Sequence, residues 1–417
     1  MFGLRNPLST KRERLFTVLD IGTENVKSLV CLAQGKDVEI LGRGIKKQNP
    51  REMESGTITD IAGVIENCHL AMREAERMAG ATPTQMIFGV AGELIKGATS
   101  TITYKRRDPG SKIHQEELKN IVHKVQWKAF EKVRSDLAYE TGYNEIDVKL
   151  VHAAIVDTRI DGYKVSNPIG FQGREVMMSV FNAFSPLVHF GALQTICAEM
   201  DKELLAIMAE PYAVGRLLGG TELQGYSGVF MDIGGATTDL TIVQDGSVIG
   251  TKMFNIGGRS FTKRLAQALN ISHDEAEDVK LAFSNNQLEH QSHSIVEKAL
   301  GSDVEVWLSG VYFSLQEFLD IDSLPPTVYL CGGGSLLPLL KDGLENSDWY
   351  KKLKFPRKPQ IKYLLPKHVS HIKDQTQILD SPQDITPIAL ASIGMEIMTE
   401  EKILTKMLQK VVRLMQV

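Results

Sequence analysis

The sequence has 417 residues, too many for one ordinary hydrophobic core, and this length predicts two domains with room for an inserted third. Hydrophobic residues make up 43% of the chain and charged residues 24%, which is typical of a globular protein. The net charge of -4 supplies no basic field, so a nucleic-acid partner is not expected.

Local sequence features indicate the cellular compartment and the absence of an obvious metal-binding motif. No run reaches the roughly 18 apolar residues that a membrane span needs, and residues 1–14 lack the apolar centre of a signal peptide. The His290/His293 and His368/His371 pairs have no further ligand at metal-binding spacing. Scattered cysteines favour a reduced cytosol, and they are Cys31, Cys68, Cys197 and Cys331.

The predicted elements begin with residues 16–30, FTVLDIGTENVKSLV, which give an apolar strand, a polar turn and a second, alternating strand. A third strand is predicted at residues 36–44 and a helix at 59–79. We therefore expect residues 15–91 to open a first α/β domain.

The segment 92–182 has a different sequence pattern: Pro and Gly residues interrupt it, and it contains no copy of the opening pattern. We interpret it as an inserted α+β subdomain, after which residues 183–227 continue the first domain. The alternative, that the segment simply extends the first domain, stays open. Its predicted elements are a strand at 100–104, a helix at 115–130 and strands at 148–157 and 175–184.

The opening pattern returns at residues 228–243, GVFMDIGGATTDLTIV. Asp232 follows Asp20, and Gly234 follows Gly22, by the same 212 residues, about half the chain. A repeat of that size indicates two similar domains. A strand at 245–254 and a helix at 260–269 follow. The second domain is expected to cover 228–345, and the chain to return to the first domain over 346–399.

The two Asp-Ile-Gly turns are predicted to bind phosphate. Glycine lets the backbone approach a ligand closely, and the N–H groups of such a turn form a concave site for anions. Carboxylates repel phosphate, so Asp20 and Asp232 are expected to hold a hydrated Mg²⁺ instead. Single turns of this kind also simply join strands, but two copies favour a ligand. Three hydroxyls can add donors, those of Thr23, Thr237 and Thr238.

A third glycine cluster follows the predicted strand 327–331. It comprises Gly332, Gly333, Gly334 and Ser335, and a helix is predicted from 336. A strand-to-helix turn exposes backbone N–H groups where the phosphate or sugar of a nucleotide can lie. An empty connecting turn is the alternative.

These three motifs, in this order, resemble the two phosphate loops and the adenosine loop of the actin, sugar-kinase and heat-shock-chaperone superfamily. The resemblance implies an α/β, actin-like two-domain fold with duplicated mixed β-sheet domains that binds ATP and Mg²⁺. It assigns Asp20 and Asp232 to the metal and its water. The implied nucleotide contacts are Gly22, Thr23, Gly234, Gly235, Thr237 and residues 332–335, with Glu277 and Lys280 of the HDEAEDVK stretch at the adenine.

Within the superfamily, the inserted segment after Gly92 resembles that of the FtsA family of cell-division proteins, and the resemblance covers residues 15–395. It implies a scaffold that tethers FtsZ-type filaments to the inner membrane, and it leaves self-polymerisation open. The short link between Lys280 and Val296 is closer to PilM, a pilus-assembly protein. A PilM-like role is therefore the alternative, and a small-molecule kinase a third.

Glu210, in AEPYAVG, lies in a motif similar to one in which the chaperone and MreB branches place a glutamate that promotes hydrolysis. The resemblance implies that Glu210 orients an attacking water as a general base, giving a weak ATPase. A helix-capping or ion-pairing role beside Pro211 is the alternative.

Residues 402–416 form an amphipathic pattern at about 100° per residue, within an expected terminal helix at 400–417. One face is apolar, and the other carries four cations and no acid. Such a helix is typical of a membrane interface, and FtsA has one at this end. The expected location is thus the cytoplasmic face of the inner membrane. Docking on the protein body is the alternative.

Overall fold

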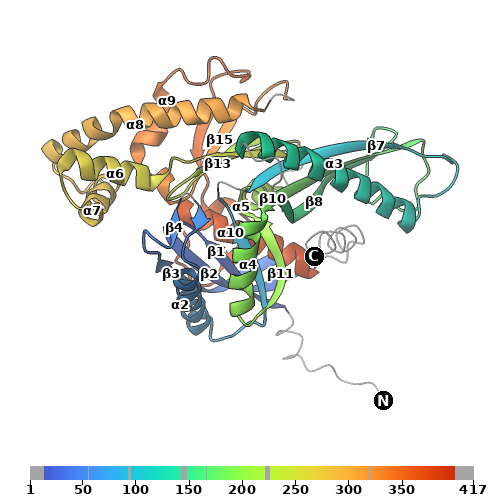
Figure 1. Ribbon diagram of the computed structural model, residues 1–417, viewed down its shortest axis with the longest axis horizontal. Coiled ribbons are helices and arrows are strands. Elements are labelled where there is room, and N and C mark those ends of the chain that lie inside the picture. Colours follow the sequence, from blue (N-terminus) through green and yellow to red (C-terminus); the bar gives the residue numbers. More distant parts are fainter. Residues whose placement is uncertain are drawn as a thin grey trace.

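The computed structural model describes residues 14–54, 56–92, 95–141, 148–165, 167–220, 226–318 and 321–399. Two large sheets form two lobes, the lower and upper parts of Figure 1. Ser55 and the predicted helix at 400–417 lie outside the described residues. None of the helices in the described ranges is both long and apolar enough to cross a membrane.

The lower lobe is built on a six-stranded sheet with the order β11-β6-β1-β2-β3-β17. Strands β1, β2 and β3 form the predicted antiparallel meander. Strands β6, β11 and β17 add parallel pairs, so the sheet is mixed. The strands are β1 Leu15–Ile21, β2 Asn25–Gln34, β3 Asp37–Lys47, β6 Gln85–Val90, β11 Glu203–Ala209 and β17 Ile372–Asp374.

Helices cover both faces of this sheet because alternate residues of β1 point into different cores. Val18 packs in the core that includes α5 and α10, and Leu19 packs in the core that includes α2 and α4. The four helices are α2 Ile61–Ala79, α4 Leu187–Glu199, α5 Glu210–Arg216 and α10 Ile385–Thr399.

Helix α2 lies so close to β3 that two strand positions require glycine. A Cβ at Gly42 would lie 2.1 Å from the carbonyl oxygen of Ala75, and one at Gly44 would lie 1.9 Å from that of Ala71. The side chain of Asp60 caps the first turn of α2. The close packing of α2 on β3 holds the meander in place, and the first turn of the meander is part of the candidate site.

The upper lobe repeats the opening of the lower one, as the 212-residue repeat predicts. Strands β12, β13 and β14 form a second antiparallel meander, and β15 pairs in parallel with β12 as β6 does with β1. The strands are β12 Gly228–Ile233, β13 Thr238–Gln244, β14 Ser247–Phe254, β15 Thr327–Cys331 and β16 Gln360–Tyr363. The helices are α6 Gly258–Leu269, α7 His273–Ser284, α8 His290–Gln316 and α9 Pro338–Asn346.

The segment predicted to be an inserted subdomain extends to one side of the molecule (Figure 1). Its strands continue the upper sheet, giving nine strands in the order β16-β15-β12-β13-β14-β7-β10-β8-β9. The junction is a single pair, Gly250 of β14 opposite Ala98 of β7. The elements are β7 Lys96–Lys105, α3 Gln115–Thr141, β8 Val148–Ile160, β9 Tyr163–Lys164 and β10 Glu175–Pro186.

The return of the chain to the lower lobe differs from the expected start at residue 346. Strand β16 still pairs in parallel with β15 of the upper sheet, and only β17 reaches β3. The physical reason is that β15 has a free edge beyond β12, which the short strand β16 covers.

Candidate functional site

The two Asp-Ile-Gly turns face each other across a cleft of about 240 Å³ between the lobes. They have the same construction, because the N–H of Gly22 donates to the carbonyl oxygen of Asn25 at 3.1 Å and that of Gly234 to Thr237 at 2.9 Å. A Cβ on Gly235 would lie 3.1 Å from the Cβ of Glu24. The duplicated motif therefore brings its two turns almost into contact.

The third glycine turn closes another side of the cleft. Gly332 has φ 81°, and a Cβ there would lie 2.2 Å from Oδ1 of Asp232. Residues 332–334 line the cleft. Ser335 does not: it is fully buried, and its hydroxyl donates to the carbonyl oxygen of Gly332 at 2.7 Å. Its place in the structure is thus to close the turn.

Of the three hydroxyls named as donors, Thr23 and Thr237 line the cleft. Thr237 donates its hydroxyl to Oδ2 of Asp239 at 3.1 Å. Thr238 is fully buried and donates to the carbonyl oxygen of Ile256 at 2.7 Å. The expectation for Thr238 was wrong, because alternation along β13 turns its side chain away from the cleft.

Four acids converge at the floor of the cleft, namely Asp20, Glu210, Asp232 and Asp239. Burial raises the pKa of Asp20 to about 6, and Lys27 opposes this rise from 3.9 Å away. Burial and the charge of Asp232 raise the pKa of Asp239 to about 8. Desolvation also raises the pKa of Asp232. The carboxyls of the cluster are therefore held toward their protonated forms, and a nearby cation would favour their ionisation.

Glu210 is the first residue of α5, at the point where β11 ends. Its side chain is buried, and its Oε1 has no hydrogen-bond partner. Burial, with the charge of Asp20 next in importance, raises its pKa well above the usual range. A buried oxygen without a partner is costly, and Glu210 is one of the residues that line the cleft.

The cleft fits a divalent cation bound through water. Six carboxyl groups and only three cationic side chains line it, so a polyphosphate without a metal ion would oppose the ionisation of these carboxyls. No three His, Cys, Asp or Glu side chains within the described residues stand close enough to hold a metal ion directly. Mg²⁺, which keeps several of its waters, suits Asp20 and Asp232.

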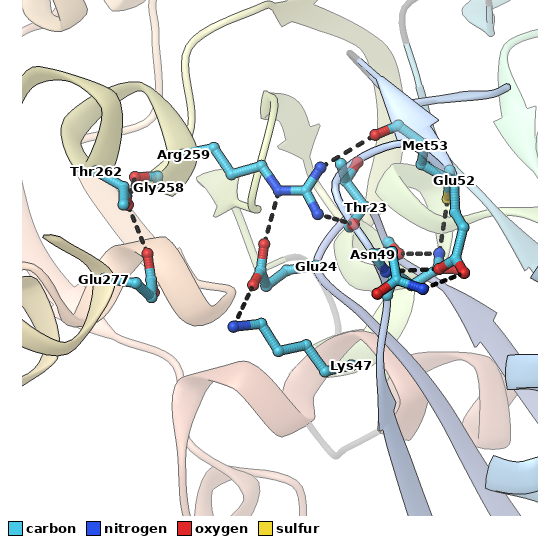
Figure 2. Close-up of polar contacts among 12 residues, drawn as sticks. Thr23, Glu24, Lys47, Asn49, Glu52, Met53, Gly258, Arg259, Thr262 and Glu277 are labelled. Atoms are coloured by element: carbon cyan, nitrogen blue, oxygen red, sulfur yellow. Dashed lines mark hydrogen bonds and ion pairs between the residues drawn. The ribbon is translucent and has the colours of Figure 1, made fainter. Parts of the chain in front are cut away.

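At the far end of the cleft, α7 presents Glu277 and Lys280, the pair expected near adenine. Their side chains form an ion pair of 2.7 Å, and the hydroxyl of Thr262 also donates to Oε2 of Glu277 at 2.5 Å. Figure 2 shows Thr262 bonded to Glu277 in the upper lobe; Glu277 lines the cleft, whereas Thr262 is fully buried. Apolar contact there comes from Leu281, Leu336 and Leu337.

Sequence reasoning missed several cleft residues, among them Lys27, Asp239, Arg259 and Thr386. Lys27 and Asp239 had a usable signal, because the register of the first hairpin pairs Lys27 with Asp20 and that of the second pairs Asp239 with Asp232. Arg259 and Thr386 had none, since they reach the cleft from segments far along the chain.

A duplicated mixed-sheet fold with phosphate-type turns facing one cleft is the arrangement of actin-like proteins. The solved structure of the PilM-PilN type IV pilus biogenesis complex supports this fold, with a TM-score of 0.65 and 16% identity over 91% of this chain and 98% of that one. The chain has an actin-like fold.

Within that class the sequence is similar to FtsA. The family model described as cell division protein FtsA matches residues 229–383. FtsA of Neisseria meningitidis is 27% identical over 279 residues, covering 66% of this chain and 62% of that protein. FtsA of Bacillus subtilis is 23% identical over 357 residues, covering 80% and 77%. This similarity agrees with the resemblance of its motifs, and the chain matches less than two thirds of the length of the Neisseria protein.

Proposed function

We propose that the cleft binds Mg·ATP. The observation that carries this proposal is the pair of equivalent turns facing each other, whose backbone N–H groups suit a polyphosphate. Calorimetry with ATP should show binding that chelation of Mg²⁺ by EDTA weakens strongly. Equal binding heats with and without EDTA would show that binding does not need the metal. The absence of binding heat under both conditions would show that the cleft does not bind ATP.

The residues of the chain would divide the work. Gly22, Gly234 and Gly235 leave room for phosphates, and Lys27 offers a cation. Bound Mg²⁺ would supply charge neutralisation, and Asp20 and Asp232 would hold its waters. Glu210 would hold and orient a water beside the terminal phosphate, accepting its proton once the metal has neutralised the cluster. Glu277, Lys280 and the turn 332–334 would hold the nucleoside.

We further propose that the protein is an FtsA-like scaffold that links FtsZ-type filaments to the cytoplasmic face of the inner membrane. Sequence similarity to FtsA proteins over most of the chain supports this role. The membrane contact is assigned to residues 402–416, and self-association into polymers is part of the proposal. Co-sedimentation with FtsZ filaments and anionic vesicles tests it, and binding to neither would contradict it.

A PilM-like role in pilus assembly is the second candidate. The chain passes from α7 to α8 through residues 285–289 alone, which agrees with the short link noted in the sequence. Pull-down with the C-terminal peptide of FtsZ and, separately, with the cytoplasmic tail of a pilus protein distinguishes the two roles. A kinase of the same superfamily would instead show ATP turnover only with a sugar or similar acceptor.

A further inference from the structure

One side chain crosses the cleft and joins its two phosphate-type turns. Arg259 lies in the first turn of α6, in the upper lobe, and its own N–H donates to the carbonyl oxygen of Gly235 at 2.7 Å. Its guanidinium reaches the lower lobe, as Figure 2 shows. Nε donates to Oε2 of Glu24 at 2.7 Å, and Nη2 donates to the carbonyl oxygen of Thr23, also at 2.7 Å. Arg259 thus touches both turns.

A third contact ties Arg259 to the short strand β4 Met53–Glu54, whose Met53 lines the cleft. Nη1 donates to the carbonyl oxygen of Met53 at 3.0 Å. This segment is itself fixed, because the carboxylate of Glu52 accepts from the N–H of Asn49 at 2.6 Å and from the side chain of Asn67 at 2.7 Å. The guanidinium therefore holds onto rigid groups of the lower lobe, at three points and in one plane.

The position of Arg259 differs from that of the other contacts between the lobes. Helices α5 and α10 share one hydrophobic core with strands of both sheets, so they join the lobes at the buried floor of the cleft. The side chains of Arg259 and Glu24 are 17% and 25% exposed, and they stand nearer to solvent. Opening the lobes about their shared floor would have to break the contacts of Arg259.

We propose that Arg259 and Glu24 form a latch that holds the cleft closed and sets the rate of nucleotide exchange. This inference rests on the proposed nucleotide site and adds its regulation. Arg259 acts as a positioning residue, since its guanidinium is committed to the lower lobe. Any partner that competes for Glu24 would open the cleft, and Lys47, whose Nζ lies 3.7 Å from Oε1 of Glu24, shows that a second cation has access.

The test is the dissociation rate of a fluorescent ATP analogue with Mg²⁺, chased with excess ATP. Arg259→Met and Glu24→Gln should each raise the rate by about tenfold, because truncating one member of a hydrogen-bonded charge pair acts mainly on dissociation. The double variant should dissociate no faster than either single one. Arg259→Lys should fall between, since lysine keeps the charge but loses the planar, three-point contact.

Arg264→Met is the matched control. Arg264 lies on the same helix and pairs with Asp303 at 2.6 Å within the upper lobe, so its loss should leave the rate unchanged. Salt dependence is a second measurement: raising ionic strength should speed dissociation more in the natural protein than in Arg259→Met. Rates within twofold of the natural protein in both latch variants would overturn the proposal.

A second measurement separates the latch from the nucleotide site. The four native cysteines are buried, so spin labels at Glu66→Cys on α2 and Lys298→Cys on α8 report the distance between the lobes. In the ligand-free protein, Arg259→Met should lengthen and broaden that distance. An unchanged distance would refute the latch even if nucleotide binds. A protein whose lobes open as expected but which binds no nucleotide would refute only the proposed function.

Discussion

The hydroxyl of Thr386 donates a 2.6 Å hydrogen bond to Oδ2 of Asp232, so the second residue of α10 holds the aspartate of the second phosphate-type turn. The two residues come from different lobes, and the hydrogen bond lowers the pKa of Asp232 against the larger effect of desolvation. Thr386 therefore keeps the carboxylate of Asp232 both oriented and more readily ionised.

Replacing Thr386 with valine, which has nearly the same shape, should weaken Mg·ATP binding by roughly tenfold. Loss of the donor leaves one oxygen of Asp232 unsatisfied, which costs about 1–3 kcal/mol. Calorimetry on Thr386→Val measures the change, with Thr195→Val, a change on the exposed side of α4, as the control. Equal affinity in both variants would show that Asp232 does not depend on this contact.

Valine at two of the glycines should have opposite effects on folding and binding. At Gly234 the nearest atom to an added Cβ, the carbonyl oxygen of Thr237, is 3.5 Å away, so Gly234→Val should keep its melting temperature while it loses ATP affinity. At Gly332, positive φ and the 2.2 Å approach to Asp232 predict a loss of stability, on the order of 2–4 kcal/mol. Thermal melts and calorimetry on the two variants test this prediction, and a higher melting temperature for Gly332→Val than for Gly234→Val would contradict it.

The acid cluster predicts opposite pH dependences for stability and binding. A carboxyl whose pKa is higher in the folded than in the unfolded protein stabilises the fold below its unfolded pKa, and this stability is lost as pH rises through the folded value. For Asp20 the rise from 3.8 to about 6 corresponds to roughly 3 kcal/mol, and for Asp239 the loss continues to about pH 8.

The urea midpoint of the ligand-free protein should therefore fall from pH 5 to pH 8, while affinity for Mg·ATP rises over the same range as the carboxylates ionise. Asp239→Asn should flatten the upper part of the stability curve. A midpoint that rises with pH in the ligand-free protein would contradict the raised pKa values.

Glu210→Gln should slow ATP hydrolysis at least tenfold while ATP affinity stays within a few-fold, because the amide keeps the size of the side chain but cannot accept a proton. Single-turnover hydrolysis and calorimetry measure the two quantities separately. Loss of affinity together with rate would instead assign Glu210 to holding the start of α5.

Removal of residues 402–417 should release the protein from anionic vesicles with little change in melting temperature. The four cations of the predicted helix would each add about 1 kcal/mol of attraction to such a surface, and salt would screen it. Lys406→Glu with Lys410→Glu should weaken vesicle binding without truncation. A large fall in melting temperature, with no vesicle binding by the full chain, would indicate a helix docked on the protein body.

The sequence predicted the duplicated meanders because each depends on local signals, an alternating strand and a turn marked by Asp-Ile-Gly. It could not reveal the latch or the Thr386 contact, which join residues 235 and 154 positions apart. Such contacts form only when the lobes pack, and no local pattern encodes them. The prediction that the Thr238 hydroxyl faces the cleft was wrong for a local reason, because a one-residue step along a strand reverses the direction of the side chain.

The cross-strand partners in the two turns also give the cleft an electrical direction. At matched positions of the repeat, Lys27 stands opposite Asp20 in one hairpin and Asp239 stands opposite Asp232 in the other. The backbone alone would offer a linear anion two near-equivalent orientations, related by the duplication. One lysine in exchange for one aspartate removes that equivalence, so a bound anion with two different ends would favour one orientation in the cleft.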